Sequence, residues 1–264
     1  SSEVGVGYAQ DDDHMRKIIG IVPARMASTR FPGKPLEKIL GIPMIGHVYQ
    51  RCKLSEILNE VYVATCDNEI YDAVSSFGGK AVMTSARHER ASDRIAEAAQ
   101  NLEADVFTMI QGDEPLTFPD MIDAANQPFI DDESVECVNL VKQISSQDEF
   151  YNPDTIKVVM DKAGFALFMS RQPIPHCGSG SFIDTKAFKQ VCIIPFSNDA
   201  LSRYTSLSPT PLEQAESIDM MRFIENDINV RMIETEFDTH AVDTMEDLVR
   251  VEKLMANDRL INIY

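Results

Sequence analysis

The sequence has 264 residues, of which 44% are hydrophobic, so the chain can bury a substantial core in one large domain or two small ones. Its formal net charge is −18, from 42 acidic and 24 basic residues. Such a surface repels phosphate backbones, which excludes nucleic acid as the expected partner but not a small phosphorylated ligand in a local basic pocket. No apolar run reaches the roughly 20 residues of a membrane-spanning helix, so no membrane insertion is expected.

The first 14 residues differ from the rest, because they are polar and acidic and lack the basic-then-apolar order of a secretory signal. We expect the native chain to start at Met15 and residues 1–14 to be a leader without function. The five cysteines are widely spaced, with no CxxC pair that would indicate zinc or redox chemistry. This pattern favours small core residues over nucleophiles, and the reducing cytoplasm as the location.

The first half of the chain alternates strand-like and helix-like patterns. Apolar runs predict buried strands at 17–23, 61–65, 81–83 and 106–110. Helical spacing of apolar residues predicts a helix that starts at Pro43 and two more at 68–77 and 93–102. This alternation predicts an α/β fold with a mostly parallel sheet covered by helices on both faces. Ligands bind beyond the carboxyl ends of the strands in such sheets, so a site is expected there.

The pattern changes after Asp132, where predicted strands follow one another directly. These strands are expected over 134–142, 155–161, 164–170 and 188–196, with a hairpin turn at 161–164. Helices are predicted at 199–207, 213–226 and 245–255, with a strand at 229–236. We interpret residues 15–264 as one α/β domain with a strand-rich insertion at about 134–197.

The segment PARMASTRFPGKP follows the first predicted strand and is the richest candidate for chemistry. It gathers three cations and small polar residues in one strand-to-helix loop: Arg25, Arg30, Lys34, Ser28, Thr29 and Gly33. Backbone N–H groups and flexible cations in such a loop suit a triphosphate. It is not a Walker A loop, which would need Gly at position 28 and Ser or Thr at position 35. A solvated basic loop is the alternative interpretation.

Two acidic segments are candidates for a metal site. In QGDEP, Asp113 follows the strand predicted at 106–110 and Gly112 allows close approach, which suits a magnesium ion shared with phosphates. An ordinary polar turn is the alternative. In VDTMEDL, Asp243 and Glu246 have the spacing of a helix capping box, and spacing alone favours capping over metal binding.

Taken in order, the motifs resemble those of the 3-deoxy-manno-octulosonate (Kdo) cytidylyltransferases, also called CMP-Kdo synthetases. The matching segments are PARMASTRFPGKPL, QGDEP, NPDTIKVV, ALFMSRQPIP, PLEQAES and VDTMEDL, and the resemblance runs from about Lys17 to Met255. It implies a three-layer, Rossmann-like fold of the nucleotide-diphospho-sugar transferase type. It also implies a Mg²⁺-dependent enzyme that transfers CMP from CTP to the anomeric hydroxyl of a sugar acid and releases pyrophosphate. The family further suggests a cytoplasmic homodimer, paired through the strand-rich insertion, that serves lipopolysaccharide biosynthesis.

The resemblance assigns roles to individual residues. It implies catalytic roles for Arg25, Lys34 and Asp113, and metal binding by Asp113 and Asp243. Nucleotide binding is implied for Ala24, Arg25, Ser28, Lys34, Ser92, Arg94 and Gln111. Sugar-acid binding is implied for Gln111, Arg171, Gln190, Glu213 and Glu216.

The loop expected to read the pyrimidine departs from the family pattern. The family usually has HQSGTER there, whereas this chain has HERASDR. Arg90 and Ala91 therefore replace Ser and Gly, and a side chain in place of Gly removes backbone freedom and room for close approach. Strict selection of CTP is thereby put in question.

A second departure lies in KQVCIIPF, where the family has RHIGIYGY. Gln190, Ile194 and Phe196 replace a His and two Tyr residues, and Pro195 replaces a Gly. A pocket without these hydrogen-bonding rings should select less well for sugar hydroxyls. This predicts a modified octulosonate (deoxy or amino) or a different keto-acid as substrate, and repacking of the insertion is the alternative.

Two further functions stay open. One is a related nucleotidyltransferase for another acid, such as a nonulosonate or a phosphonate. The other is a non-catalytic protein that kept the fold, although the joint presence of Arg25, Lys34, Asp113 and Asp243 argues against it.

Overall fold

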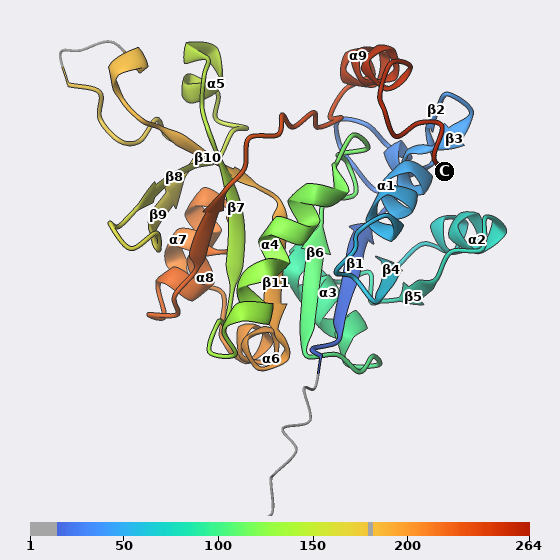
Figure 1. Cartoon of the computed structure of the whole chain (residues 1–264), viewed down its shortest axis with the longest axis horizontal. Helices are drawn as coiled ribbons and strands as arrows, with labels where there is room; N and C mark the ends of the chain where they lie inside the picture. The colour runs from blue at the N-terminus through green and yellow to red at the C-terminus, as the bar shows by residue number, and fades with distance from the viewer. Residues whose placement is uncertain (1–14, 179–181) are drawn as a thin grey trace, which may run out of the picture.

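The computed structural model describes residues 15–178 and 182–264, so the leader predicted at 1–14 lies outside the described part. Two five-stranded sheets lie side by side in the described chain, with helices packed around them (Figure 1). A two-stranded ribbon follows the first loop and consists of β2 (Lys38–Ile39) and β3 (Ile42–Pro43).

The first sheet is mostly parallel, as the sequence predicts. Its strand order is β11-β6-β1-β4-β5, and the strands are β1 (Ile18–Ala24), β4 (Glu60–Thr65), β5 (Ala81–Met83), β6 (Val106–Ile110) and β11 (Ile193–Ser197). All neighbours are parallel except β11, which pairs antiparallel with β6. The central strands β1 and β6 are buried on both faces, which explains why their sequences are apolar without alternation. The three-layer α/β prediction is thereby confirmed.

Helices cover both faces of this sheet. One face carries α1 (Met44–Lys53), α2 (Asn68–Ser76) and α4 (Pro119–Asp131), and the other carries α3 (Ala91–Ala99) and α6 (Asn198–Ser206). Helix α4 is absent from the sequence predictions, and its sequence contains two prolines. Pro119 occupies the first turn, where no N–H donor is needed, while Pro128 lies inside the helix.

The second sheet is largely antiparallel. Its order is β12-β7-β10-β8-β9, and the strands are β7 (Val138–Gln143), β8 (Lys157–Met160), β9 (Ala166–Ser170), β10 (Phe188–Val191) and β12 (Arg231–Glu234). The predicted hairpin turn joins β8 to β9, with Gly164 at φ 87°. Strand β12 pairs parallel with β7, so this sheet includes a strand from beyond the insertion predicted at about 134–197.

Two predicted elements are wrong, because each is two elements in the structure. The strand predicted at 188–196 is divided at Cys192, with β10 in the second sheet and β11 in the first. The helix predicted at 213–226 is divided into α7 (Pro211–Glu216) and α8 (Met221–Ile224), because Ser217 adopts a left-handed conformation with φ 54°. The remaining elements are η1 (Lys34–Leu36), α5 (Gln147–Tyr151), η2 (Phe182–Asp184) and α9 (Met245–Met255).

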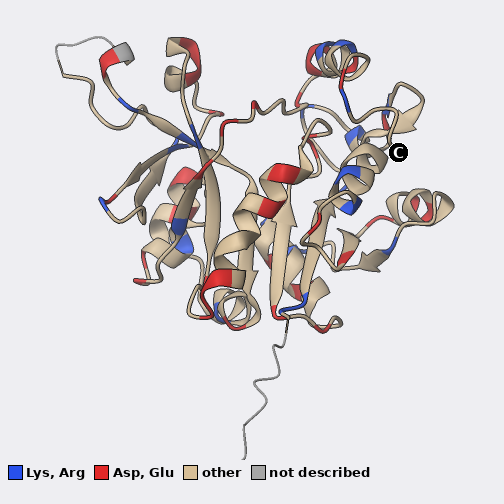
Figure 2. Cartoon of the chain, viewed as in Figure 1, with Lys and Arg blue, Asp and Glu red and all other residues tan. Residues whose placement is uncertain are grey.

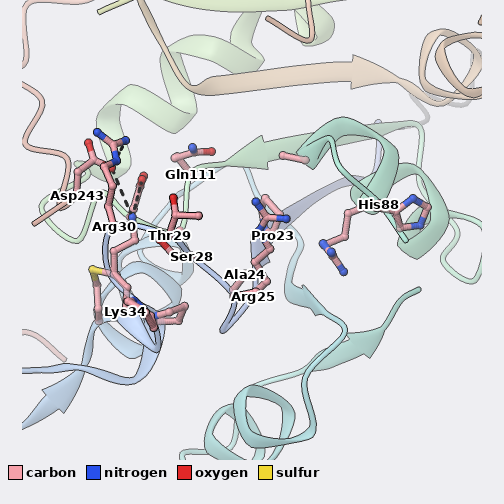
Figure 3. Close-up of a pocket in the computed structure, with 18 of the residues that line it drawn as sticks. Pro23, Ala24, Arg25, Ser28, Thr29, Arg30, Lys34, His88, Gln111 and Asp243 are labelled. Carbon is pink, nitrogen blue, oxygen red and sulfur yellow. Dashed lines mark hydrogen bonds and ion pairs between the residues drawn. The ribbon is translucent and has the colours of Figure 1, made fainter. Parts of the chain in front are cut away.

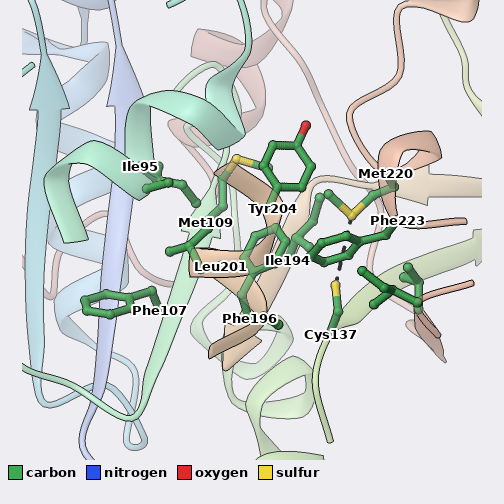
Figure 4. Packing of buried hydrophobic residues seen from close by; sticks show 14 of the residues in the cluster. Ile95, Phe107, Met109, Cys137, Ile194, Phe196, Leu201, Tyr204, Met220 and Phe223 are labelled. Carbon is green, nitrogen blue, oxygen red and sulfur yellow. Dashed lines mark hydrogen bonds between the residues drawn. The ribbon is translucent and has the colours of Figure 1, made fainter. Parts of the chain in front are cut away.

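The largest apolar core joins the first sheet to α3, α6 and α8 (Figure 4). Phe196 packs in it against Phe223, with ring centroids 6.0 Å apart, and Phe223 packs against Tyr204 at 5.3 Å. Ile194 and Phe196 are fully buried in this core. Their position supports the repacking interpretation of the KQVCIIPF departure for these two residues, because neither side chain reaches the surface of a pocket.

Charged side chains lie mainly on the helices and loops around the sheets, whereas β1, β6 and β11 carry none (Figure 2). In the described ranges, no helix combines the length and apolar character that a membrane crossing requires.

Candidate active site

A cleft of about 770 Å³ opens at the carboxyl ends of β1 and β6, where the topology of a parallel sheet places ligand sites (Figure 3). Three segments line it, namely the end of β1 with the loop that follows, residues 88–91 and Arg94 at the start of α3, and the QGD residues after β6, together with Met44 and Asp243. Six of the seven residues predicted to bind nucleotide line the cleft, namely Ala24, Arg25, Ser28, Lys34, Arg94 and Gln111. The two predicted metal residues, Asp113 and Asp243, line it as well.

The loop after β1 is closed by local hydrogen bonds. Gly33 adopts φ 73°, which favours glycine, and its N–H donates to the carbonyl of Met26 at 2.9 Å. The Ser28 hydroxyl accepts from the N–H of Phe31, whose ring is buried, at 3.2 Å. These contacts turn the chain back, so that Lys34 begins η1 with its side chain facing the cleft.

Lys34 joins the loop to both carboxylates. Its Nζ lies 3.2 Å from Asp113 Oδ2 and 3.6 Å from Asp243 Oδ1, and it donates to the Val242 carbonyl at 2.7 Å. These residues come from three distant parts of the sequence, and Figure 3 shows Lys34 and Asp243 on one side of the cleft. The loop cation and the two acidic motifs therefore converge on one position, as the triphosphate interpretation requires.

Gly112 permits this convergence. A Cβ at this position would lie 2.8 Å from the Pro23 carbonyl oxygen, a distance that real Cβ atoms do not show. The glycine therefore lets the chain after β6 pack directly against the end of β1. The Asp113 carbonyl accepts a hydrogen bond from the N–H of Val242 at 2.8 Å. This bond fixes the VDTMEDL segment beside QGDEP.

The two carboxylates fit a magnesium ion. Asp113 Oδ1 is buried and has no hydrogen-bond partner in the described structure. Burial away from water raises the pKa of Asp113. The nearby Lys34 ammonium opposes this rise, because a positive charge favours the ionised carboxylate. No cluster of three or more His, Cys, Asp or Glu residues that could hold a metal occurs within 15–178 and 182–264. Magnesium commonly takes one or two carboxylates and completes its shell with phosphate oxygens and water, which matches a pair of acids in a phosphate cleft.

The capping box predicted at Asp243 is displaced by one residue. Thr244 is the N-cap of α9 and its hydroxyl accepts from the N–H of Asp247 at 3.2 Å, while the Asp247 carboxylate accepts from the Thr244 N–H at 3.0 Å. Asp243 therefore does not cap the helix with Glu246. Its carboxylate points instead to Lys34 and to Arg30, whose Nη2 lies 3.4 Å away.

Arg30 is a cleft residue to which the sequence assigned no individual role. Besides Asp243, its guanidinium contacts Asp154 at 3.1 Å. Asp154 belongs to the NPDT segment, which precedes β8 in the second sheet. The sequence indicated a role for Arg30 only by placing it among three cations in one loop. It does not indicate which carboxylates form ion pairs with Arg30.

The opposite wall is formed by the start of α3. Arg94 lines the cleft. Its guanidinium donates to Thr84 Oγ1 at 2.6 Å and to the Ser85 carbonyl at 3.2 Å, so it also fixes the start of α3 to the segment after β5. Ser92 is fully buried and its hydroxyl donates to Asp219 at 2.8 Å, so it does not line the cleft. The contact of Ser92 with nucleotide therefore stays a prediction, and the buried position of Ser92 does not support it.

The predicted sugar-acid residues, apart from Gln111, lie outside this cleft. The Glu216 carboxylate accepts from Ser170 Oγ at 2.7 Å and from the Arg171 N–H at 2.9 Å. The Arg171 guanidinium donates to backbone carbonyls, including that of Glu216 at 2.6 Å. Gln190 lies on β10 and donates to Asn139 Oδ1 at 2.7 Å. Their predicted roles stay predictions.

Glu213 is enclosed by protein. Its carboxylate accepts from Arg222 Nε at 2.9 Å and Nη2 at 2.7 Å, and from the Thr210 N–H at 3.0 Å in a capping box. The side chain has no exposed surface, so its position indicates a structural ion pair rather than a direct contact with ligand.

Comparison with known proteins identifies the family. A model of the cytidylyltransferase family matches residues 19–233. The 3-deoxy-manno-octulosonate cytidylyltransferase of Geobacter metallireducens is 42% identical over 248 residues, which cover 90% of this chain and 98% of the relative. The chain belongs to the 3-deoxy-manno-octulosonate cytidylyltransferase family. The relative of the same name from Solibacter usitatus is 43% identical over 239 residues, which cover 90% of this chain and 94% of the relative.

Solved structures agree with the family assignment. CMP:2-keto-3-deoxy-manno-octonic acid synthetase in complex with CTP is 39% identical, with a TM-score of 0.85 over 91% of this chain and 98% of that chain. The 4-diphosphocytidyl-2C-methyl-D-erythritol synthase of Anaerococcus prevotii is 13% identical, with a TM-score of 0.60 over 92% of this chain and 97% of that chain, and shows a shared fold only. The resemblance inferred from the motifs is thereby confirmed.

Proposed function

We propose that this protein transfers CMP from CTP to the anomeric hydroxyl of 3-deoxy-octulosonate, or of a closely related sugar acid, and releases pyrophosphate. The observation that carries the proposal is the contact of Lys34 with both Asp113 and Asp243 in a cleft at the carboxyl end of the sheet. The family relatives carry this activity in their names, and one of them binds CTP in its solved structure.

The reaction is a substitution at phosphorus. The anomeric hydroxyl oxygen forms a bond to the α-phosphorus, the hydroxyl proton is released, and the bond to the bridging oxygen of pyrophosphate breaks. Both partners are anions, so positive charge near the phosphates is required. Arg25 and Lys34 line the cleft and supply that charge, while the cleft volume of about 770 Å³ lies in the range of small-molecule sites.

Asp113 and Asp243 are the residues that would hold a magnesium ion. A bound magnesium ion would neutralise phosphate oxygens and favour departure of pyrophosphate. Lys34 balances the charge of both carboxylates, as its distances of 3.2 and 3.6 Å indicate. The same ammonium can turn to a phosphate oxygen when nucleotide and metal are present.

We further propose that the enzyme works as a cytoplasmic homodimer in lipopolysaccharide biosynthesis. All five cysteines are free thiols, which agrees with a reducing compartment. Tyr151 and Leu167 expose apolar surface on the strand-rich side of the molecule, where the family is expected to pair. Light scattering of the purified protein would reveal a monomer if this pairing did not occur.

The test of the proposed function is pyrophosphate release against a matrix of acids and nucleotides. We expect turnover with CTP and octulosonate or a deoxy or amino derivative, and comparison with UTP and ATP shows whether Arg90 and Ala91 relax the selection of CTP. Turnover only with a nonulosonate or a phosphonate would establish a different acid as substrate. Binding of CTP without pyrophosphate release from any acid would refute the enzymatic function.

A further inference from the structure

Arg90 connects the nucleotide wall of the cleft to the turn between α7 and α8. It lines the cleft at the N-cap of α3, and its side chain is 20% exposed. Its guanidinium nevertheless donates away from α3, from Nη1 to Ser217 Oγ at 2.7 Å and from Nη2 to the Glu213 carbonyl at 3.2 Å. One side chain therefore joins segments that are more than a hundred residues apart in sequence.

The turn that Arg90 contacts is conformationally unusual. Ser217 has φ 54° and ψ 53°, a left-handed conformation that non-glycine residues adopt at a cost. A second arginine reaches the same turn, because Arg171 donates from Nη2 to the Ser217 carbonyl at 3.0 Å. Two guanidinium groups thus donate to one strained residue, Arg90 to its hydroxyl and Arg171 to its carbonyl.

Charge favours the same placement of Arg90. Its Nε lies 3.6 Å from Glu213 Oε1 and 3.9 Å from Asp219 Oδ1. Arg222 already neutralises Glu213 from the other side, while Asp219 accepts from the N–H and hydroxyl of Ser92. Arg90 supplies the second positive charge beside these two acids, so its removal would leave Asp219 without a close cation.

The turn lies next to Glu216, a residue implied to approach the sugar acid. The Glu216 carboxylate accepts from the Arg171 N–H, and its carbonyl accepts from Arg171 Nε. Arg171 also donates to the Ser217 carbonyl, and Ser217 directly follows Glu216, so the conformation of Ser217 bears on the position of both residues. On the other side, His88, Ala91 and Arg94 of the Arg90 segment line the cleft in which nucleotide is proposed to bind.

We propose that Arg90 is a positioning residue that couples nucleotide binding to sugar-acid binding, by holding the Ser217 turn against the wall of the nucleotide cleft. The inference rests on the proposed function. Arg90 acts through Ser217 and Glu216 and touches neither reacting atom. A nucleotide that orders the 88–94 segment would, through Arg90, also order the turn that presents Glu216 and Arg171.

The first test compares Arg90→Ser with Arg90→Lys and with Arg87→Ser, a matched change at an exposed arginine of the same loop. We expect Arg90→Ser to raise the KM for the sugar acid about tenfold, the size expected for losing charged hydrogen bonds, while the Kd for CTP changes less than about twofold. Arg90→Lys should recover part of the loss, because it keeps the charge beside Glu213 and Asp219. Arg87→Ser should leave both constants unchanged.

The second test is a double-mutant cycle of Arg90→Ser with Ser217→Ala, measured as the acid KM at saturating and at limiting CTP. We expect the two changes to be non-additive, because each removes the same hydrogen bond. Additive effects, an unchanged acid KM in Arg90→Ser, or equal losses of acid and CTP binding would overturn the proposal. Thermal unfolding of each variant separates these outcomes from a folding defect.

The wild-type assay distinguishes this inference from the proposed function. Absence of turnover in the wild-type protein with every acid refutes the function, and the coupling falls with it. Wild-type turnover with an unchanged acid KM in Arg90→Ser refutes only the role of Arg90.

Discussion

The two ends of the proposed substrate site differ in how their residues are engaged. At the nucleotide end, Lys34, Asp113 and Asp243 meet at one point, and Asp113 keeps a buried oxygen without a partner in the described structure. At the acid end, Arg171 and Glu216 are satisfied by each other, by the Ser170 hydroxyl and by the backbone. Unsatisfied groups are prepared for a ligand, whereas satisfied groups must exchange partners before they can bind one.

The largest effect is expected at the nucleotide end, from Asp113→Asn. The change removes one negative charge beside Lys34 and one of the two proposed metal ligands, so pyrophosphate release should fall about 10² to 10³-fold or more. Circular dichroism should show an unchanged fold. Asp72→Asn, at an exposed position on α2, is the matched control and should keep full activity. Near-normal turnover of Asp113→Asn would remove the basis for treating this end as the reaction centre.

A second change tests whether the nucleotide end depends on close backbone packing. Gly112→Ala would place a methyl group 2.8 Å from the Pro23 carbonyl, so the QGDEP segment must shift. A displacement of about 1 Å near the chemistry can cost about 10²-fold in rate, which is the loss expected in kcat. A variant with wild-type kcat and an unchanged melting temperature would show that the loop tolerates the shift.

The acid end should respond in stability rather than in binding when Glu213 is changed. Glu213→Gln breaks a buried ion pair with Arg222, and removing one partner of such a pair costs about 3–5 kcal/mol of unfolding free energy. Urea unfolding measures this loss. The acid KM should stay close to wild type, since the carboxylate is enclosed. A large rise in KM without loss of stability would place Glu213 in contact with substrate after all.

Gln190→His tests the acid end further, and its expected effect on kcat/KM is smaller. The family has His at this position, and Gln190 at present donates to Asn139. If Gln190 faces the substrate during turnover, the change should raise kcat/KM on unmodified octulosonate a few-fold relative to deoxy or amino derivatives. Equal values for all acids would leave Gln190 as a packing residue of β10.

The last prediction concerns the pH dependence of stability at the nucleotide end, which is measured without turnover. Burial, with the neighbouring Asp113 carboxylate, raises the pKa of Glu114 from 4.5 to about 8. A folded-state pKa above the unfolded value means that the folded protein binds the proton more tightly, so this contribution is complete below pH 4.5 and is lost as the pH rises to about 8. Glu114→Gln should flatten the decline of the melting temperature over that interval. An equally steep decline in the variant would contradict the assignment.

The nucleotide end was predictable because its residues lie directly after buried parallel strands. An apolar run such as β1 predicts the strand, and parallel topology brings its carboxyl end beside that of β6, so Arg25, Lys34 and Asp113 could be expected together. Asp243 joined them only through the family resemblance, because spacing alone favoured capping.

The acid end was less predictable because it is assembled from turns and from a change of sheet. A left-handed serine at position 217 carries no sequence signal, and it divides the predicted helix. Likewise, an apolar run over 188–196 does not indicate that the chain passes from one sheet to the other at Cys192. The enclosure of Glu213 depends on Arg222, a partner that no motif links to it.

The passage of the chain between sheets at Cys192 has a mechanical consequence. The Cys192 carbonyl accepts from the N–H of Gln111 at 3.2 Å, so the residue at which β10 of one sheet continues directly into β11 of the other is also hydrogen-bonded to the first residue of the QGDEP motif. Any sliding of one sheet along the other would stretch this bond and pull on the residues next to Asp113. A movement of the strand-rich sheet would thus displace, within a few peptide units, the residues at which the triphosphate is proposed to bind.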